Sequence, residues 1–158
     1  MFAMYTSCYL RMIPSTKSKN IFSLIFDFRN LLPIILILFI FFLDRYSKSQ
    51  ILTNFDEKSF YINDFLNINL LWNTGVGFGL FSTNSNTFYN FISLLIFSII
   101  VILIYIVLTS DKNDKIIFSI IIGGALGNFY DRIYYKAVPD FIDLHYNNFH
   151  WFTFNVSD

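Results

Sequence analysis

Long apolar blocks alternate with polar segments along this chain, and the blocks predict membrane-spanning helices. The clearest block, residues 88–108, carries no charge and is long enough to cross a bilayer with slight tilt. An earlier block, residues 31–43, is uninterrupted hydrocarbon, but it is shorter than the roughly 20 residues that a span needs. We therefore expect the first helix to continue through the charged segment 44–48 to about Leu52, which places those charges near the outer membrane boundary.

A third apolar helix is expected to begin at about Ile116. Gly123, Gly124 and Gly127 give it a face of small residues, which favours close packing against another helix. The helix then runs outward through Asn128 and Arg132, which share a face because they stand four residues apart.

The segment between the first two spans has the pattern of strands rather than of a membrane helix. Residues 60–62 and 65–72 alternate partly between apolar and polar side chains, as half-buried strands do. The glycines at 75, 77 and 79 permit sharp bends and close backbone approach. We expect a small extracytoplasmic sheet, or cradle, lying on the membrane. Residues 133–158 are rich in tyrosine and polar groups, which is typical of an aromatic belt at the lipid headgroups.

These elements predict an all-α polytopic membrane protein, a helical bundle with three spans in this chain and a small extracytoplasmic β cradle. Only 14% of the residues are charged and 55% are hydrophobic, against about 25% charged in a soluble domain. The formal net charge is zero, which argues against nucleic acid as a partner. Basic residues dominate positions 1–30, so the positive-inside rule places this N-terminal extension in the cytoplasm.

The candidate chemistry lies where the third helix leaves the membrane. Ionisable groups close to the membrane interior are costly, so a functional role is their default interpretation. Asn128 and Arg132 are followed by two further carboxylates, Asp140 and Asp158. Two carboxylates held a few ångströms apart share one proton, so one can activate water while the other protonates a carbonyl oxygen. We expect the asparagine and arginine to order this aspartate pair for hydrolysis of a peptide bond at a membrane surface.

Other interpretations of the polar residues carry less weight. Asp131 next to Arg132 is interpreted as structural, in a local ion pair. The chain has two histidines, His145 and His150, which could bind a metal together with Asp140 or Asp143. Their spacing suits no helical ligand pair and a zinc site needs better-placed ligands, so we expect interfacial histidines, no metal and no cofactor.

A non-enzymatic alternative remains open. A small membrane transporter or scaffold could also carry a cluster of Asp, Arg and Lys at the membrane boundary. A transporter, however, would place its charges near the middle of the membrane and would often show an internal repeat. In this chain the polar residues gather at one boundary and no repeat is evident.

Five motifs occur in an order that resembles the lipoprotein signal peptidase (signal peptidase II) family. They are Asp44-x-x-Ser47-Lys48, Asn73-x-Gly75-x-x-Phe78-Gly79, Gly123-Gly124-x-x-Gly127-Asn128-x-x-Asp131-Arg132, Val138-x-Asp140-Phe141 and Phe154-Asn155-x-x-Asp158. The resemblance covers residues 32–158, so residues 31–158 are assigned to the family's domain. The family has a further membrane helix after its last aspartate, which makes this domain C-terminally incomplete and predicts a fourth span after Asp158.

The resemblance implies an aspartic endopeptidase that removes the signal peptide from diacylglyceryl-modified prolipoproteins, cleaving just before the lipidated cysteine. The family's catalytic dyad falls on Asp140 and Asp158. Its substrate-binding and supporting residues fall on Asp44, Lys48, Asn73, Gly124, Asn128, Arg132 and Asn155.

The resemblance also implies a setting for the enzyme. We expect a monomeric, multi-pass protein of the bacterial cytoplasmic (inner) membrane, with its N-terminus in the cytoplasm and its active site at the extracytoplasmic face. The lipid bilayer and the lipidated precursors are its expected partners, and globomycin-type cyclic peptides are its expected inhibitors. Two positions depart from the family pattern, because Pro139 stands where valine is favoured and Ser157 where alanine is usual.

Overall fold

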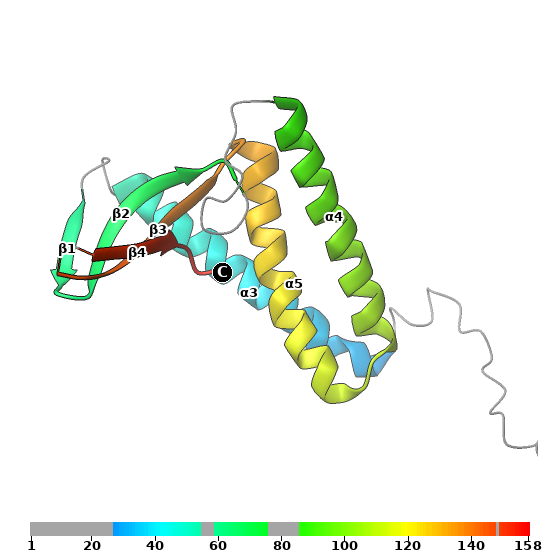
Figure 1. The fold of residues 1–158 in the computed structure, drawn as a ribbon. Coiled ribbons are helices and arrows are strands. Elements are labelled where there is room, and N and C mark those ends of the chain that lie inside the picture. The colour runs from blue at the N-terminus through cyan, green and yellow to red at the C-terminus, as the bar shows by residue number, and fades with distance from the viewer. Residues whose placement is uncertain (1–26, 55–58, 76–85, 148) are drawn as a thin grey trace, which may run out of the picture.

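A computed structural model describes residues 27–54, 59–75, 86–147 and 149–158. In chain order the elements are the short 3-10 helix η1 (Phe28–Asn30), α3 (Leu31–Asn54), β1 (Phe60–Asn63), β2 (Leu66–Asn73), α4 (Asn86–Thr109), α5 (Lys112–Tyr134), β3 (Val138–Tyr146) and β4 (Phe149–Phe154). The three long helices form one part of the molecule and the four strands form the other (Figure 1).

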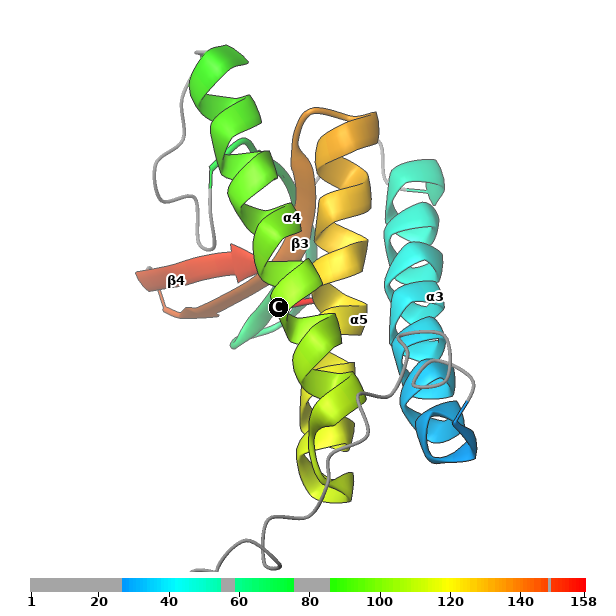
Figure 2. The same ribbon diagram turned by 90° about the vertical axis from the view of Figure 1, so that its right-hand side faces the viewer.

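Helix α5 is the centre of the helical part. It packs against both α3 and α4 and lies between them (Figure 2). The packing against α3 depends on the predicted face of small residues. A Cβ atom added to Gly123 would lie 2.7 Å from the Cβ of Ile40, and one added to Gly127 would overlap a carboxylate oxygen of Asp44. The two helices approach this closely because glycine has no side chain to separate them.

The first helix continues through its charged segment, as predicted. Helix α3 runs without interruption from Leu31 past Asp44 and Lys48 to Asn54. These two charged side chains are almost fully buried, at 0% and 1% exposure. Lys48 faces α5, because its partners Asn128 and Asp131 are on that helix. Asp44 lies against Gly127 of the same helix.

The outer surface of the helices is apolar. Large hydrophobic side chains are exposed along all three helices, among them Leu38, Phe39 and Phe42 of α3, Phe91, Leu94, Leu95 and Ile102 of α4, and Ile117 and Ile121 of α5. Charged side chains are buried between the helices instead. This inverse distribution is unfavourable in water but suits a protein surrounded by lipid.

In the part of the chain that the structure describes, two helices are long and apolar enough to cross a membrane, namely Tyr89–Thr109 within α4 and the whole of α5. Helix α3 is equally long but carries Asp44, Arg45 and Lys48 in its second half. The expected count of three spans therefore stays a prediction. The prediction of a helix over residues 88–108 is confirmed by α4.

The four strands form one antiparallel sheet in the order β1-β2-β3-β4. Strands β1 and β2 confirm the two strands predicted before Trp72. The glycines at 77 and 79 and Phe78, which were expected to shape the cradle, lie outside the described residues.

Strands β3 and β4 were not predicted, and they make the sheet larger than the expected cradle. The start of β3 lacks the usual alternation because Val138, Pro139, Asp140 and Phe141 are all buried. A strand covered on both faces shows no period of two in its sequence. Together β3 and β4 form a hairpin at the C-terminal end of the chain (Figure 1).

Candidate active site

Asp140 lies on β3, opposite Leu71 of the neighbouring strand β2. Its side chain is almost fully buried, with the residue 2% exposed. The Nδ2 amide of Asn155 donates a hydrogen bond to one carboxylate oxygen at 2.7 Å, and the Nδ2 amide of Asn73 donates to the other at 2.9 Å. Each oxygen of this buried carboxylate is therefore held by a neutral donor from a neighbouring segment of chain.

These surroundings raise the pKa of Asp140 above its ordinary value. Burial is the largest cause, because it disfavours the charged form. The hydrogen bonds from Asn155 and Asn73 oppose it, the nearby negative charge of Asp158 raises the pKa further, and the positive charge of Lys48 lowers it. The carboxyl group of Asp140 consequently keeps its proton at a higher pH than a solvated aspartic acid does.

Asp158 is held at the same place by two further donors. The Nδ2 amide of Asn128 donates to one of its carboxylate oxygens at 2.8 Å. The backbone N–H of Asn155 donates to the other at 3.1 Å. Asn155 therefore contacts both carboxylates, Asp140 through its side chain and Asp158 through its backbone.

Asn155 is itself oriented by the turn that follows β4. Its Oδ1 atom accepts a hydrogen bond from the backbone N–H of Ser157 at 2.8 Å, which is the geometry of an Asx turn. With Oδ1 occupied in this way, the Nδ2 group faces Asp140 as a donor. This short turn thus brings an aspartate on β3 and an aspartate beyond β4 to one site.

Asn128 is oriented by a cation on one side and a carboxylate on the other. Its Oδ1 atom accepts a hydrogen bond from Lys48 Nζ at 2.7 Å, while its Nδ2 group donates to Asp158. The ammonium group can only donate and the ionised carboxylate can only accept. The amide therefore has one satisfactory orientation, and it presents a donor to Asp158.

Lys48 Nζ donates a second hydrogen bond to Asp131 Oδ2 at 2.7 Å, in addition to the one to Asn128. It also forms an ion pair with Asp44, with Nζ 2.8 Å from Oδ1. The predicted pairing of Asp44 with Lys48 is therefore present. Among the described residues, neither forms a hydrogen bond or an ion pair with Asp140 or Asp158, and Lys48 is linked to Asp158 through Asn128.

The expected local ion pair of Asp131 with Arg132 was wrong. Asp131 pairs across the helix interface with Lys48 and with Arg45 of α3. Arg45 was missed by the sequence analysis, although it stands within the Asp44 motif. Its guanidinium group bridges the carboxylates of Asp44 and Asp131, so two cations neutralise two buried acids at this interface.

Arg132 supports the backbone around the carboxylates. Its Nη2 group donates to the carbonyl oxygen of Gly75 at 2.8 Å, and its Nη1 group donates to the carbonyl oxygen of Asn128 at 3.2 Å. The Nε atom is buried and has no hydrogen-bond partner within the part of the chain that the structure describes. Arg132 thus connects the segment after β2 with α5, and its Nε–H group stays available to donate a further hydrogen bond.

Gly124 provides the surface on which the last turn rests. A Cβ atom at this position would overlap the carbonyl oxygen of Ser157. A Cβ atom added to Gly127, one turn further along α5, would lie 2.7 Å from the hydroxyl oxygen of Ser157. The glycine face of α5 therefore receives the turn that carries Asp158 as well as helix α3.

The residues predicted from the sequence fall into two groups in space. Asn73, Asn128 and Asn155 contact the carboxylates directly, whereas Asp44, Lys48, Gly124 and Arg132 support those contacts from behind.

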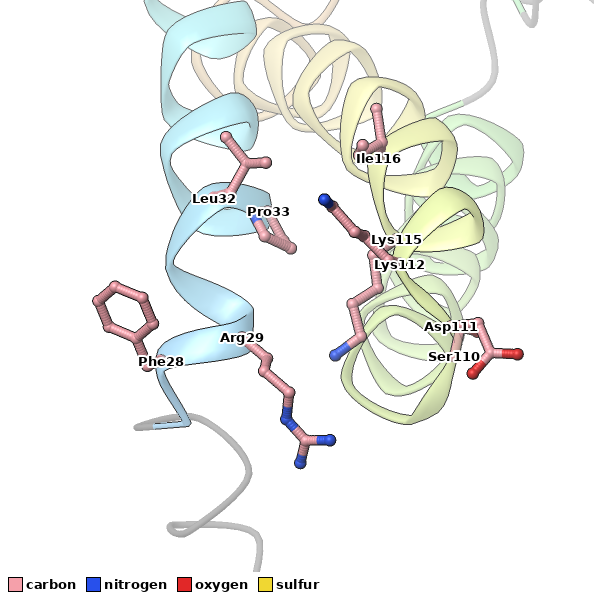
Figure 3. Close-up of a pocket in the computed structure, with 9 residues that line it drawn as sticks. All are labelled: Phe28, Arg29, Leu32, Pro33, Ser110, Asp111, Lys112, Lys115 and Ile116. Carbon is pink, nitrogen blue, oxygen red and sulfur yellow. The ribbon is translucent and has the colours of Figure 1, made fainter.

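A cavity of about 360 Å³ lies elsewhere, between the N-terminal ends of α3 and α5 (Figure 3). It is lined by Phe28, Arg29, Leu32, Pro33, Ser110, Asp111, Lys112, Lys115 and Ile116. None of these residues is among those that contact Asp140 or Asp158. The cavity is therefore separate from the paired carboxylates, which lie near the C-terminal end of α5.

Comparison with known proteins connects this arrangement to one family. The model of the family described as signal peptidase (SPase) II matches residues 36–158. A lipoprotein signal peptidase from Pelagibacter ubique is 48% identical over 130 residues, covering 80% of this chain and 78% of that protein. A lipoprotein signal peptidase from Francisella tularensis subsp. mediasiatica is 39% identical over 130 residues, covering 78% of this chain and 80% of that protein.

A solved structure gives the same picture. A protein described as a bacterial membrane enzyme is similar to this chain with a TM-score of 0.68 and 30% sequence identity. The similarity covers 80% of this chain and 78% of the solved one. It therefore includes most of the helices and strands described above.

Proposed function

Since this chain belongs to the signal peptidase II family, we propose that Asp140 and Asp158 are the carboxylates with which it cleaves its substrates. It is an aspartic-type protease that removes signal peptides from lipoproteins, as its family and its named relatives indicate. The non-enzymatic alternative, a transporter or scaffold, is not favoured by these relationships.

The observation that carries the catalytic assignment is the double contact of Asn155. Asn155 donates one hydrogen bond to Asp140 through its side chain and a second to Asp158 through its backbone N–H. The two carboxylates therefore share a neighbour. The charge of Asp158 also contributes to the raised pKa of Asp140. The two carboxylates therefore belong to one site, in which the negative charge of Asp158 favours the protonated form of Asp140.

Hydrolysis by such a pair needs neither a metal nor a covalent intermediate. The ionised carboxylate takes a proton from water as the water attacks the peptide carbonyl carbon, and the protonated carboxyl donates its proton to the carbonyl oxygen. The raised pKa of Asp140 favours its protonated form, as the proton donor of such a pair requires. The Nε–H group of Arg132, which has no partner among the described residues, could donate a hydrogen bond to a carbonyl oxygen of the substrate.

The expected substrates are diacylglyceryl-modified prolipoproteins, cut just before the lipidated cysteine. The apolar outer faces of α3, α4 and α5 support this substrate class, because lipid tails can stay in the bilayer while the polypeptide reaches the carboxylates. We place the carboxylates and the sheet at the extracytoplasmic face of the bacterial inner membrane, with three spans and a cytoplasmic N-terminus. A monomer and inhibition by globomycin-type peptides belong to the same proposal.

Substitution of either aspartate tests the assignment. The variants Asp140→Asn and Asp158→Asn should each lower the rate of signal-peptide removal from a lipidated precursor by at least about 100-fold, the lower range of a lost acid or base. Cleavage is measured in detergent micelles or vesicles by the mobility shift of the precursor. Unchanged elution and an unchanged melting temperature of each variant would show that the protein is folded.

The matched control is Asp64→Asn. Asp64 is an exposed carboxylate in the turn between β1 and β2 of the same sheet, and it should be dispensable for cleavage. Full cleavage by a folded Asp140→Asn or Asp158→Asn protein would show that this pair is not the catalytic dyad.

A further inference from the structure

Three potential metal ligands come together on the β3–β4 hairpin. Asp143, His145 and His150 each offer one ligand atom, and these atoms all lie within 4.8 Å of one another. From the sequence no metal site was expected here, because the spacing of the histidines suits no helical ligand pair. That reasoning does not apply to a hairpin, where residues five apart can face each other across the turn.

The strand register explains why the three side chains meet. His145 of β3 is paired directly with His150 of β4, and directly paired side chains point to the same face. Asp143 precedes His145 by two residues on β3, so it also points to that face. The shift of register between Asp143 and His145 adds one residue to β4, which is a β-bulge, a device that re-aims side chains at such positions.

The contacts at this face leave ligand atoms available. The Nδ1 atom of His150 lies 2.8 Å from a carboxylate oxygen of Asp143, and the two imidazole rings are stacked with centroids 5.2 Å apart. The Nδ1 atom of His145 is buried and has no hydrogen-bond partner among the described residues. A buried polar atom without a partner is costly and calls for an explanation, and coordination through this nitrogen would supply one.

We propose that Asp143, His145 and His150 bind a divalent transition-metal cation of the zinc class. Imidazole and carboxylate are ligands of such cations, at about 2.0–2.2 Å from Zn²⁺, so tetrahedral ligand atoms lie roughly 3.3 Å apart. The carboxylate and the ring of His150 are already this close, and the remaining ligand atoms need only a small closure. Three protein ligands leave a fourth position for water.

The position of this site gives the cation a structural consequence. It would join β3 to β4, and these strands carry the two aspartates of the proposed dyad, Asp140 three residues before Asp143 and Asp158 after the end of β4. Metal binding to the folded hairpin stabilises the folded state by mass action. The metal proposal stands on the hairpin geometry alone and does not require the catalytic assignment.

Zinc titration of the full chain tests the proposal. The protein is purified in detergent micelles with a tag that contains no histidine, stripped with EDTA and titrated with Zn²⁺ by calorimetry. We expect one zinc ion per chain, a zinc-dependent rise in melting temperature, and visible absorption bands typical of four-coordinate Co²⁺ when cobalt is added instead. His150→Ala should weaken zinc binding by more than about 100-fold, because changes even outside the ligand shell cost 10–100-fold.

His150→Ala is the preferred variant because the His150 side chain is 55% exposed, so its loss should not prevent folding; His145→Ala repeats the test at the second ring. Asp64→Asn, an exposed acid on the same sheet, should bind zinc as the wild type does. The Asp140→Asn protein should do so too, which separates this site from the paired carboxylates. Absence of zinc binding in the wild type, or unchanged binding in both histidine variants, would overturn the proposal.

Discussion

Among the described residues, the side chains that donate hydrogen bonds to Asp140 and Asp158 are asparagine amides, and the cationic side chains contact the amides or the backbone instead. Asn73, Asn128 and Asn155 donate directly to the carboxylates. Lys48 is linked to Asp158 through Asn128, and its charge is neutralised by Asp44 and Asp131. A cation in direct contact would favour two ionised carboxylates, which would remove the shared proton. Neutral donors can hold the carboxylates in place without that effect.

This arrangement predicts how the pH dependence responds to loss of one amide. Burial raises the pKa of Asp140, and the hydrogen bond from Asn73 partly opposes the rise by stabilising the ionised form. Asn73→Ala should therefore raise the pKa further and move the pH–rate profile to higher pH. The expected displacement is about 1–2 pH units, since a hydrogen bond to a charged group is worth about 1.5–3 kcal/mol and one unit is 1.36 kcal/mol.

The measurement is the rate of precursor cleavage as a function of pH. Asn69→Ala is the matched control, because Asn69 is an exposed asparagine on the same strand, and its profile should coincide with that of the wild type. A profile of Asn73→Ala that moves to lower pH, or a uniform loss of rate with no displacement, would contradict the role given to this amide.

The same pKa has a consequence for stability. When folding raises the pKa of an acid, the folded state binds that acid's proton more tightly than the unfolded state does. Its contribution to the free energy of unfolding is therefore fully present below the ordinary aspartic acid pKa of 3.8 and is lost as the pH rises through the raised value. Ionisation of the buried Asp140 therefore lowers the stability of the folded protein.

At the scale of elements, one face of α5 serves two different partners. Gly123 is in contact with Ile40 of helix α3, whereas Gly124 is in contact with the backbone of Ser157 in the turn before Asp158. Gly123 therefore allows helix packing, whereas its neighbour Gly124 makes room for the turn that carries Asp158. This separation makes two matched substitutions informative.

Gly124→Ala should lower activity far more than stability. The added methyl group must displace the carbonyl of Ser157, and a displacement of about 1 Å at a catalytic group can cost about 100-fold in rate. Alanine is better than glycine in a helix by about 1 kcal/mol, so α5 itself is not weakened. The cleavage rate and the melting temperature of the purified variant check this expectation.

Gly123→Ala provides the opposite case. Its methyl group meets the Cβ of Ile40 at 2.7 Å, and overpacking of this kind typically costs about 1–3 kcal/mol of stability. The melting temperature should fall while the cleavage rate per folded molecule stays close to that of the wild type. Identical activity and stability profiles for the two variants would refute the separate roles of Gly123 and Gly124.

At the scale of the whole molecule, the distribution of polarity is inverted. Large apolar side chains cover the outside of the helices, while Asp44, Lys48, Asp131 and Arg132 are buried between them. The orientation of the chain across the membrane then decides which compartment the β-sheet faces. The helix ends at residues 110–115 and the turn between β1 and β2 lie at opposite ends of the molecule in Figure 1.

Cysteine labelling tests the proposed orientation. Cys8 is the single cysteine of the chain, so Cys8→Ser gives a cysteine-free background for Asp64→Cys or Asn113→Cys, both at exposed positions. A membrane-impermeant maleimide should label position 64 in intact spheroplasts and should label position 113 only after the membrane is permeabilised. Labelling of position 113 in intact spheroplasts would reverse the orientation.

Much of the molecule was predictable from local sequence. The uninterrupted apolar run of α4 and the small-residue face of α5 were enough to predict these two helices, because helix periodicity and hydrophobicity are local properties of the sequence. The ordered motifs also identified Asn73, Asn128 and Asn155 as members of one site. Strand β3 escaped prediction because the residues at its start are all buried and show no alternation.

The sequence by itself determined which residue types stand in which motifs, and thereby the family and the candidate carboxylates. Only the tertiary structure decided how they meet. Asp131 pairs with Lys48 and Arg45 rather than with its neighbour, and His145 faces His150 across a hairpin. The reason is physical: a buried ion pair or a strand register is selected by the packing of distant segments, and no local pattern of residues carries that information.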